Sequence, residues 1–152
     1  MSEENYTAVL LQGSGTYGVE SVLTSSVGSG KVLLITNGAY GKRMVQICEY
    51  AGISYLEYNV EYAEIPSSEM VEEILNSNGD ITHIAMVHCE TTSGILNNIE
   101  SIAYTAKAYN KTFIVDAMSS FGGIEIPVEE AGIDFSSVPQ INASREFPVL
   151  HS

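Results

Sequence analysis

Basic residues are scarce in this chain of 152 residues, which contains six lysines and arginines against 19 aspartates and glutamates. The formal net charge is −13, and the basic residues form no cluster along the sequence. Nucleic acids and anionic membranes attract proteins through clustered lysine and arginine side chains. The composition therefore argues against a nucleic-acid or membrane-surface partner, and we interpret the excess of acid as a solubility feature.

Cysteine residues and long apolar runs are also scarce. Cys48 and Cys89 form neither a disulfide framework nor a pair with metal-ligand spacing. No stretch approaches the roughly 20 apolar residues that a membrane span requires. The sequence begins Met-Ser-Glu-Glu and lacks the basic flank and apolar core of a secretory signal peptide. We therefore expect a cytoplasmic protein.

Hydrophobic residues make up 45% of the chain, enough for one core in a protein of this length. Mostly continuous apolar runs, typical of strands covered on both faces, predict strands at Thr7–Gln12, Lys31–Thr36, Ile53–Asn59, His83–Cys89 and Thr112–Met118. The segments between them favour helices at Tyr17–Ser26, Lys42–Ala51, Ser67–Asn76 and Asn98–Tyr109. This alternation predicts an α/β fold with a mostly parallel sheet and helices on both faces.

A glycine-rich turn, Gly13–Gly18, follows the first predicted strand and opens the first predicted helix. Glycines let the backbone approach a ligand closely, and the free N–H groups of a first helical turn favour a phosphate. The turn also matches the dinucleotide pattern G-x-G-x-x-G. That pattern needs an acid at the end of the second strand, where this chain has Asn37 and Gly38. A bare turn without a ligand is the third interpretation.

Asp116 closes a buried apolar run and is the strongest chemical signal in the chain. A carboxylate at the carboxyl end of a parallel strand lies where open α/β sheets bind ligands. Held ionised, it can keep a heterocyclic nitrogen protonated, as in enzymes that use pyridoxal phosphate. Tyr40, on the turn after another strand, could stack on such a ring or simply pack. His88, Cys89 and Glu90 invite a metal hypothesis, but consecutive strand residues point to opposite faces.

Four strings in the chain, LLQGSGTYGVE, TNGAYGKRM, VHCETTSGILN and IVDAMSSFGG, closely resemble the 2-aminoethylphosphonate–pyruvate transaminase family. The resemblance runs from Tyr6 to about Phe135. It implies part of the large domain of a fold-type-I aminotransferase, which depends on pyridoxal 5'-phosphate. The implied reaction moves the amine of 2-aminoethylphosphonate to pyruvate and gives phosphonoacetaldehyde and alanine. The implied partners are these small molecules and, in the family, a second copy in a homodimer.

The resemblance also implies roles for seven residues of this chain. Ser14, Gly15 and Thr16 would hold the cofactor phosphate, and Ser119 would add a further phosphate contact. Tyr40 would stack on the pyridine ring. Thr92 would reach its phenolic oxygen. Asp116, the only residue with an implied catalytic role, would pair with the ring nitrogen. No metal is implied.

The chain departs from the family in three places. It lacks the N-terminal segment that helps to build the dimer and the substrate pocket. It also lacks the rest of the large domain and the small domain with its substrate-binding arginine. The family's Schiff-base lysine, in an Asn-Lys-Cys string, should follow soon after Phe135, yet no lysine follows Lys111. We therefore expect this chain to be inactive as a transaminase.

The last residues suggest an origin for the missing lysine. Residues 136–152 have no helical or strand period, and Pro139 and Pro148 interrupt them, so they read as an unstructured tail after a partial cofactor-binding domain at 1–135. Residues 134–152 can be encoded so that one added C after the Phe135 codon yields DFLISAANKCIQGVPGFAF. That string resembles the family's lysine segment, so we interpret the tail as a frameshift product.

Three functional hypotheses remain open at this point. The chain is an active transaminase, a non-catalytic remnant that binds pyridoxal phosphate weakly or not at all, or a dinucleotide-binding module. A positioned lysine has no obvious substitute in this kind of amine catalysis, which favours the second hypothesis over the first. Saturable binding of NAD would favour the third.

Overall fold

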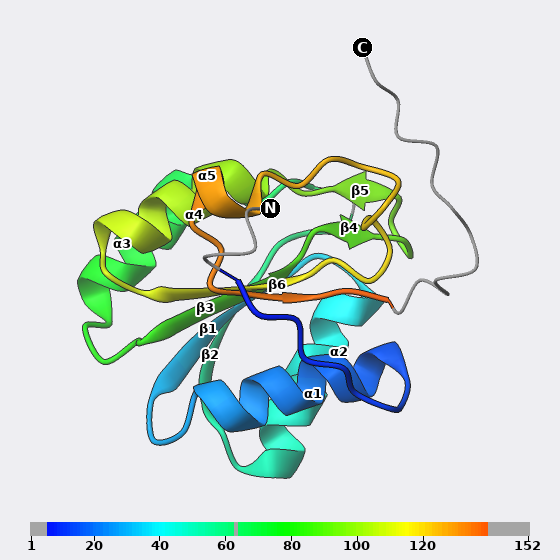
Figure 1. Cartoon of the computed structure of the whole chain (residues 1–152). Coiled ribbons are helices and arrows are strands. Elements are labelled where there is room, and N and C mark those ends of the chain that lie inside the picture. Colours follow the sequence, from blue (N-terminus) through cyan, green and yellow to red (C-terminus); the bar gives the residue numbers. More distant parts are fainter. Residues whose placement is uncertain (1–5, 63, 140–152) are drawn as a thin grey trace.

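A parallel five-stranded sheet forms the centre of the computed structural model, which describes residues 6–62 and 64–139 (Figure 1). The strands lie in the order β2-β1-β3-β6-β7, and each neighbouring pair is parallel. Their bounds are β1 (Lys31–Thr36), β2 (Ser54–Asn59), β3 (His83–Val87), β6 (Thr112–Asp116) and β7 (Phe135–Ser137). The chain reverses its direction of travel across the sheet at β1, so a topological switch point lies between β1 and β3. Open α/β sheets bind ligands beyond the carboxyl ends of the strands at such a point.

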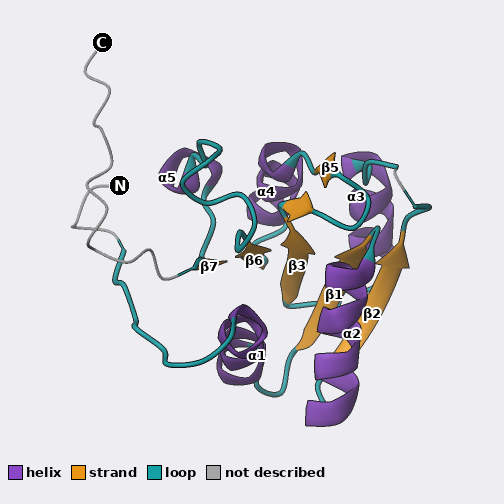
Figure 2. Cartoon of the chain, turned by 90° about the vertical axis from the view of Figure 1, so that its right-hand side faces the viewer, coloured by secondary structure: helices purple, strands orange, loops and turns teal. Residues whose placement is uncertain are grey.

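Helices cover both faces of this sheet, as the sequence predicts (Figures 1 and 2). One face carries α1 (Gly15–Ser26) and α2 (Ala39–Ala51). The other carries α3 (Ser68–Ser77), α4 (Ile99–Ala108) and the short α5 (Val128–Ala131). None of the described helices is long and apolar enough to cross a membrane. The predicted α/β class with a parallel sheet is confirmed, and four predicted helices and four of the five predicted strands are present. The strand predicted at Lys31–Thr36 has the observed bounds, and the ends of the other elements differ by at most three residues.

Alternate residues of each central strand enter two separate cores. In β1, Leu33 and Ile35 pack against the α3 and α4 face, whereas Val32 and Leu34 pack against α1 and α2. All four side chains are at most 3% exposed. Full burial of such a side chain contributes about 1.5–3 kcal/mol. The continuous apolar run of β1 is therefore required by the helices on both faces.

Side-chain caps set the starts of α3 and α4. Ser67 accepts a hydrogen bond from the Met70 amide at 3.2 Å, and Asn98 accepts one from the Ser101 amide at 3.1 Å. Such caps satisfy N–H groups that have no partner within the helix. The helix start expected near Ser67 is confirmed.

A hairpin of two short strands stands beyond the end of β3. It consists of β4 (Cys89–Glu90) and β5 (Ile95–Leu96), which pair antiparallel. The turn between them holds Gly94 in the left-handed region, with φ of 75°, which favours glycine. The sequence predicts a single strand as far as Cys89, because the apolar run continues to that residue without a turn signal.

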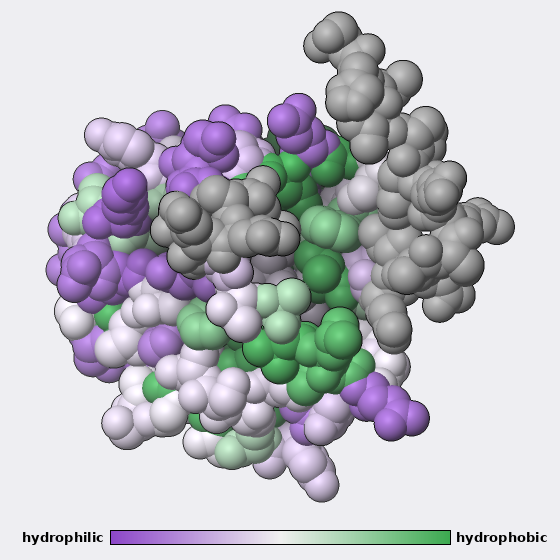
Figure 3. Space-filling model, viewed as in Figure 1, coloured by the Kyte–Doolittle hydropathy of each residue, from purple (hydrophilic) through white to green (hydrophobic). Residues whose placement is uncertain are grey.

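The strand expected at Thr7–Gln12 is wrong. This segment belongs to no strand in the structure, and Val9 and Leu10 are 75% and 86% exposed. Figure 3 shows that apolar side chains gather into a patch on this face of the molecule. An apolar run gives a strand only where a neighbouring strand accepts its backbone, and β7 rather than this segment pairs with β6. The continuous apolar run predicts a burial that this segment does not have.

The unstructured tail predicted from residue 136 is also wrong at its first two residues. Ser136 and Ser137 belong to β7, whose register pairs Ser136 with Val115 and Ser137 with Asp116. Residues 140–152, where the rest of that prediction falls, lie outside the described residues. The Ser136 hydroxyl oxygen is buried and has no hydrogen-bond partner among residues 6–62 and 64–139. A buried hydroxyl without a partner costs about 1–3 kcal/mol, so a serine is poorly suited to this position.

Replacing Ser136 with alanine should therefore stabilise the chain. The change removes the unpaired hydroxyl and keeps the strand backbone, so we expect the free energy of unfolding to rise by about 1 kcal/mol. Chemical denaturation measures this directly. Ser137→Ala at the neighbouring position, on the other face of β7, serves as the matched control and should not raise stability. A loss of stability in the Ser136 variant would show that the hydroxyl makes a favourable contact.

Candidate functional site

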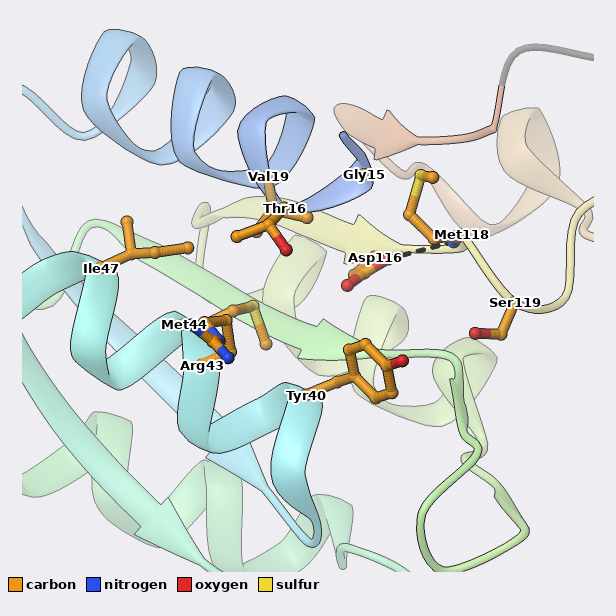
Figure 4. A pocket seen from close by; sticks show the side chains of 10 residues that line it. All are labelled: Gly15, Thr16, Val19, Tyr40, Arg43, Met44, Ile47, Asp116, Met118 and Ser119. Atoms are coloured by element: carbon orange, nitrogen blue, oxygen red, sulfur yellow. Dashed lines mark hydrogen bonds between the residues drawn. The ribbon is translucent and has the colours of Figure 1, made fainter. Parts of the chain in front are cut away.

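A cavity of about 340 Å³ opens beyond the carboxyl end of β6, at the first turns of α1 and α2. Figure 4 shows that its lining comes from these two helices and from the turn after β6. Three segments that are far apart in the sequence thus meet at one place. The lining residues are Gly15, Thr16, Val19, Tyr40, Arg43, Met44, Ile47, Asp116, Met118 and Ser119.

The structure brings together most of the residues predicted for a cofactor site. Two of the seven, Ser14 and Thr92, do not line the cavity. Ser14 immediately precedes α1, and Thr92 lies in the β4–β5 turn beside the start of α2. The five that line it are Gly15, Thr16, Tyr40, Asp116 and Ser119.

The first turn of α1 presents free backbone donors at the cavity. Ser14 caps the helix, since its hydroxyl oxygen accepts a hydrogen bond from the Tyr17 amide at 3.3 Å. The amides of Gly15 and Thr16 have no acceptor within the part of the chain that the structure describes. No acidic residue lies in this turn. A helix start with free N–H groups and no competing carboxylate fits a phosphate.

Gly15 also brings α1 against the turn that follows β6. A Cβ atom at this position would lie 2.5 Å from the terminal carbon of Met118, so any larger residue would displace that side chain. The glycine thereby allows the helix start and the turn after Asp116 to form one continuous wall. This packing joins the part of the cavity that fits a phosphate to the part that contains the carboxylate.

Asp116 ends β6 and is only 8% exposed. Burial raises the pKa of its carboxyl group, and the nearby Glu90 carboxylate raises it further. The hydrogen bond that the Met118 amide donates to Asp116 Oδ1, at 3.0 Å, opposes this shift. A buried carboxylate facing a cavity favours a cationic partner, because a nearby positive charge offsets the cost of desolvation. A protonated ring nitrogen has the required charge and donor.

Tyr40 and Asp116 lie on neighbouring sides of the cavity, with Ser119 at its edge (Figure 4). Tyr40 stands in the first turn of α2 and is 46% exposed, so its ring is not part of the core. A half-exposed aromatic ring on a cavity wall is suited to packing against a planar ligand. The residues present therefore fit a phosphorylated pyridine: donors for the phosphate, a ring to stack, and a carboxylate for the nitrogen.

The hydroxyl of Thr92 is already engaged within the protein. It donates to the Glu90 carboxylate at 2.6 Å and accepts from the Ala39 amide at 3.0 Å. A hydroxyl has one proton. Thr92 could therefore donate to a ligand oxygen only by giving up its bond to Glu90.

The sequence analysis missed several residues that line the cavity, and helical spacing could have found some of them. Arg43, Met44 and Ile47 lie three, four and seven positions after Tyr40, which places them on the same side of α2. Val19 follows Gly15 by four positions in α1 in the same way. The sequence pattern indicates Glu90 only as a possible metal ligand.

None of the four lysines in the chain lines the cavity. Lys31 and Lys111 stand at the opposite edge of the sheet, where they bond to Asp80 and to the Ile81 carbonyl. Lys42 lies in α2 but bonds to Glu57 at 2.6 Å. Lys107 lies near the end of α4. None of the four lysine side chains is therefore placed to bond with a ligand in the cavity.

The alternative hypotheses gain no support from the geometry. Among the described residues, no three His, Cys, Asp or Glu side chains converge as metal ligands. His88 instead bonds through Nδ1 to the Ser120 hydroxyl at 2.9 Å, and Glu90 bonds to Thr92. The dinucleotide pattern needs a strand before its first glycine, and Gly13 follows a segment that is not a strand.

The chain matches the family model described as aminotransferase class-V over residues 4–139. The chain belongs to this family. Class-V aminotransferases are enzymes that depend on pyridoxal phosphate, the cofactor that the sequence predicts. The ligand groups that fit the cavity are those of this cofactor.

Curated relatives of this class-V chain include 2-aminoethylphosphonate–pyruvate transaminases. It is 52% identical over 136 residues to the one from Lysinibacillus sphaericus (strain C3-41), covering 89% of this chain and 37% of the relative. It is 54% identical over 133 residues to a bifunctional phosphonoacetaldehyde hydrolase/aminoethylphosphonate transaminase from Clostridioides difficile (strain 630), covering 87% of this chain and 21% of the relative. The chain thus spans well under half the length of either protein. The resemblance inferred from the four sequence strings is confirmed.

Solved structures of class-V relatives share the fold. Alanine–glyoxylate aminotransferase from Nostoc sp. gives a TM-score of 0.81 at 25% identity over 88% of this chain and 35% of that one. Pyridoxamine–pyruvate aminotransferase from Mesorhizobium loti gives 0.77 at 30% identity over 84% of this chain and 33% of that one. The observed sheet and helices are therefore those of part of such an enzyme.

Replacing Asp116 with asparagine should stabilise the empty chain at neutral pH. Because burial raises the pKa of Asp116 in the folded state, its ionised form destabilises the fold. This cost appears as the pH rises above the unfolded carboxyl pKa near 4 and is constant above the folded pKa. The asparagine oxygen can still accept from the Met118 amide.

Unfolding of the two proteins should be compared by denaturation at several pH values. We expect the stability advantage of the variant to grow with pH through the acidic range and then to level off. Asp80→Asn, at an exposed ion pair, is the matched control and should change stability by less than about 1 kcal/mol. A variant less stable than the parent chain at pH 7 would contradict the electrostatic account of Asp116.

Proposed function

We propose that this chain is the cofactor-binding part of a 2-aminoethylphosphonate–pyruvate transaminase. The reaction of the whole enzyme would transfer the amine of 2-aminoethylphosphonate to pyruvate and give phosphonoacetaldehyde and alanine. One observation supports the proposal above the others: residues from α1, α2 and the turn after β6 converge on one cavity whose groups match pyridoxal phosphate. The identity of about 52%, over most of the chain, to 2-aminoethylphosphonate–pyruvate transaminases supports the choice of substrates.

Each residue has a proposed task. The Gly15 and Thr16 amides would donate to the cofactor phosphate, with Ser14 holding the helix start and Ser119 adding a donor from the opposite side. Tyr40 would stack on the ring, and Asp116 would keep the ring nitrogen protonated.

Thr92 would contact the phenolic oxygen of the cofactor after exchanging its bond to Glu90. When bound, the cofactor supplies an aldehyde that receives the amine and a ring that withdraws electrons. The reaction itself also requires a lysine close to that aldehyde.

The absence of that lysine leads us to propose that this chain does not catalyse transamination. Its four lysines lie away from the cavity, and two of them are held in ion pairs. Reversible binding of pyridoxal phosphate without a covalent anchor is the activity that remains. The alternative is a remnant that binds no cofactor at all.

We propose further that residues 136–152 arise from a frameshift after the partial domain at 1–135. Two observations support this origin. Residues 134–152 can be encoded so that one added C after the Phe135 codon gives a string with Asn-Lys-Cys, whose lysine falls at the position of Asn142. The same reading places leucine at position 136, beside Val115, where the buried serine hydroxyl has no hydrogen-bond partner among the described residues. An apolar residue is what such a position favours.

The proposed partners are small molecules rather than nucleic acids or membranes, and the proposed compartment is the cytoplasm. Cys48 and Cys89 are both free thiols, which fits a reducing compartment. The homodimer of the family is not part of this proposal, because no observation on the described residues bears on it.

Titration of the purified chain with pyridoxal phosphate tests the cofactor proposal. We expect saturable binding with the absorbance of the free aldehyde form. Asp116→Asn should weaken it about tenfold or more, since a hydrogen bond between charged groups contributes roughly 1.5–3 kcal/mol. After borohydride treatment, mass spectrometry should find no stoichiometric modification of a single lysine. Asp80→Asn is the matched control and should bind as the parent chain does.

Three results would contradict these statements in different ways. No saturable binding of pyridoxal phosphate would end the cofactor proposal. Stoichiometric reduction at one lysine would end the proposal that the chain lacks a covalent anchor. Saturable binding of NAD would favour the dinucleotide alternative.

Sequencing the gene through the Phe135 codon tests the frameshift. We expect a single-base change that restores Asn-Lys-Cys in one reading frame. A chain expressed from the repaired sequence should be labelled at the new lysine after borohydride treatment, unlike the present chain. A locus in which no single-base repair restores this string would overturn the proposed origin.

A further inference from the structure

A fully buried carboxylate, Glu90, connects the start of α2 with Thr92 in the turn between β4 and β5. It is 0% exposed and stands in β4, 50 residues after Tyr40 in the sequence. Its Oε2 accepts from the Tyr40 amide at 3.0 Å and from the Gly41 amide at 3.1 Å. Its Oε1 accepts from the Thr92 amide at 3.3 Å and from the Thr92 hydroxyl at 2.6 Å.

These bonds replace the cap that α2 lacks. Gly38 occupies the N-cap position and has no side chain to cap the helix. The first turn of α2 contains no acidic residue. A Cβ atom at Gly38 would lie 2.3 Å from Glu90 Cγ, so the glycine is what lets the carboxylate reach the helix. The Ala39 amide donates to the Thr92 hydroxyl oxygen. The first three amides of α2 therefore all have acceptors in the β4 segment and the turn after it.

The occupied helix start has a consequence for where an anion can bind. Two helices begin at this cavity, and each start favours negative charge. In α2 the protein's own carboxylate already takes that place. In α1 the amides of Gly15 and Thr16 have no acceptor among the described residues. Of these two helix starts, only that of α1 has amides left to bind a phosphate. This sets the orientation in which a phosphorylated ligand would bind in the cavity.

We infer that Glu90 is a positioning residue for the cofactor: it locks the backbone of Tyr40, and hence the ring that stacks, to the hydroxyl of Thr92. The inference rests on the proposed function, since it assigns to Glu90 the alignment of two residues proposed to contact pyridoxal phosphate. Glu90 does not line the cavity and acts only through these neighbours. Its burial without a cationic partner is tolerated because four donors and the positive end of α2 face it.

Two substitutions separate the bonds that Glu90 makes. Glu90→Ala removes all of them. Glu90→Gln keeps one oxygen that can accept from Tyr40 and Gly41, while its amide nitrogen must face Thr92 and cannot accept from it. Amide hydrogen exchange at Tyr40 and Gly41, measured by NMR on the empty chain, should accelerate about ten- to a hundredfold in the alanine variant and less in the glutamine variant.

Cofactor binding should follow the same order. The dissociation constant of pyridoxal phosphate should rise about tenfold or more in Glu90→Ala and less in Glu90→Gln. The circular dichroism induced in the bound cofactor should fall in both variants, because it reports the fixed stacking geometry. If the alanine variant does not fold, Glu90→Gln alone carries the comparison with the parent chain.

Gly52→Ala provides a matched control that weakens α2 at its other end. Gly52 has φ of 70° and open space around it, so alanine strains the backbone without touching the cavity. This variant should lose thermal stability but keep its cofactor affinity and induced dichroism. An equal loss of affinity in Gly52→Ala and the Glu90 variants would show a merely structural role and overturn this inference alone. A parent chain that binds no pyridoxal phosphate would overturn the proposed function and this inference with it.

Discussion

Parallel pairing of β1, β3 and β6 is the constraint on which the site depends. Parallel strands end at the same edge, and the helices that follow them begin there. The register pairs Val87 with Asp116, so the buried carboxylate is level with the end of the neighbouring strand. The start of α2, which follows β1, and Asp116 at the end of β6 therefore lie at the same edge although they are far apart in the sequence. The start of α1, which precedes β1, lines the same cavity. A slip in this register would separate the carboxylate from both helix starts.

Two buried carboxylates, Glu90 and Asp116, have different electrostatic environments at this edge of the sheet. Glu90 is buried, is bonded by four neutral donors, and closes the start of α2. Asp116 is buried, accepts a hydrogen bond from the Met118 amide, and has capacity left for a cationic ligand. The first carboxylate stabilises the site when it is empty, whereas the second is destabilised until a positive group arrives. This difference is why we assign positioning to one and ligand pairing to the other.

Much of this arrangement could be predicted from the sequence, because continuous apolar runs and helix caps act locally. Asp116 and Tyr40 were found from their places at strand ends, and both line the cavity. Two features could not be read in this way. The apolar segment around Leu10 is as hydrophobic as a strand, but whether a partner strand exists is decided elsewhere in the chain. The role of Glu90 depends on amides about 50 residues away, which no local pattern reveals.

A structure of the chain with pyridoxal phosphate bound tests the central claim most directly. The account predicts the phosphate within about 3 Å of the Gly15 and Thr16 amides, the ring nitrogen facing the Asp116 carboxylate, and Tyr40 against the ring. It predicts no bond between the cofactor and any lysine. A phosphate at the start of α2, or a cofactor bound away from this cavity, would contradict it.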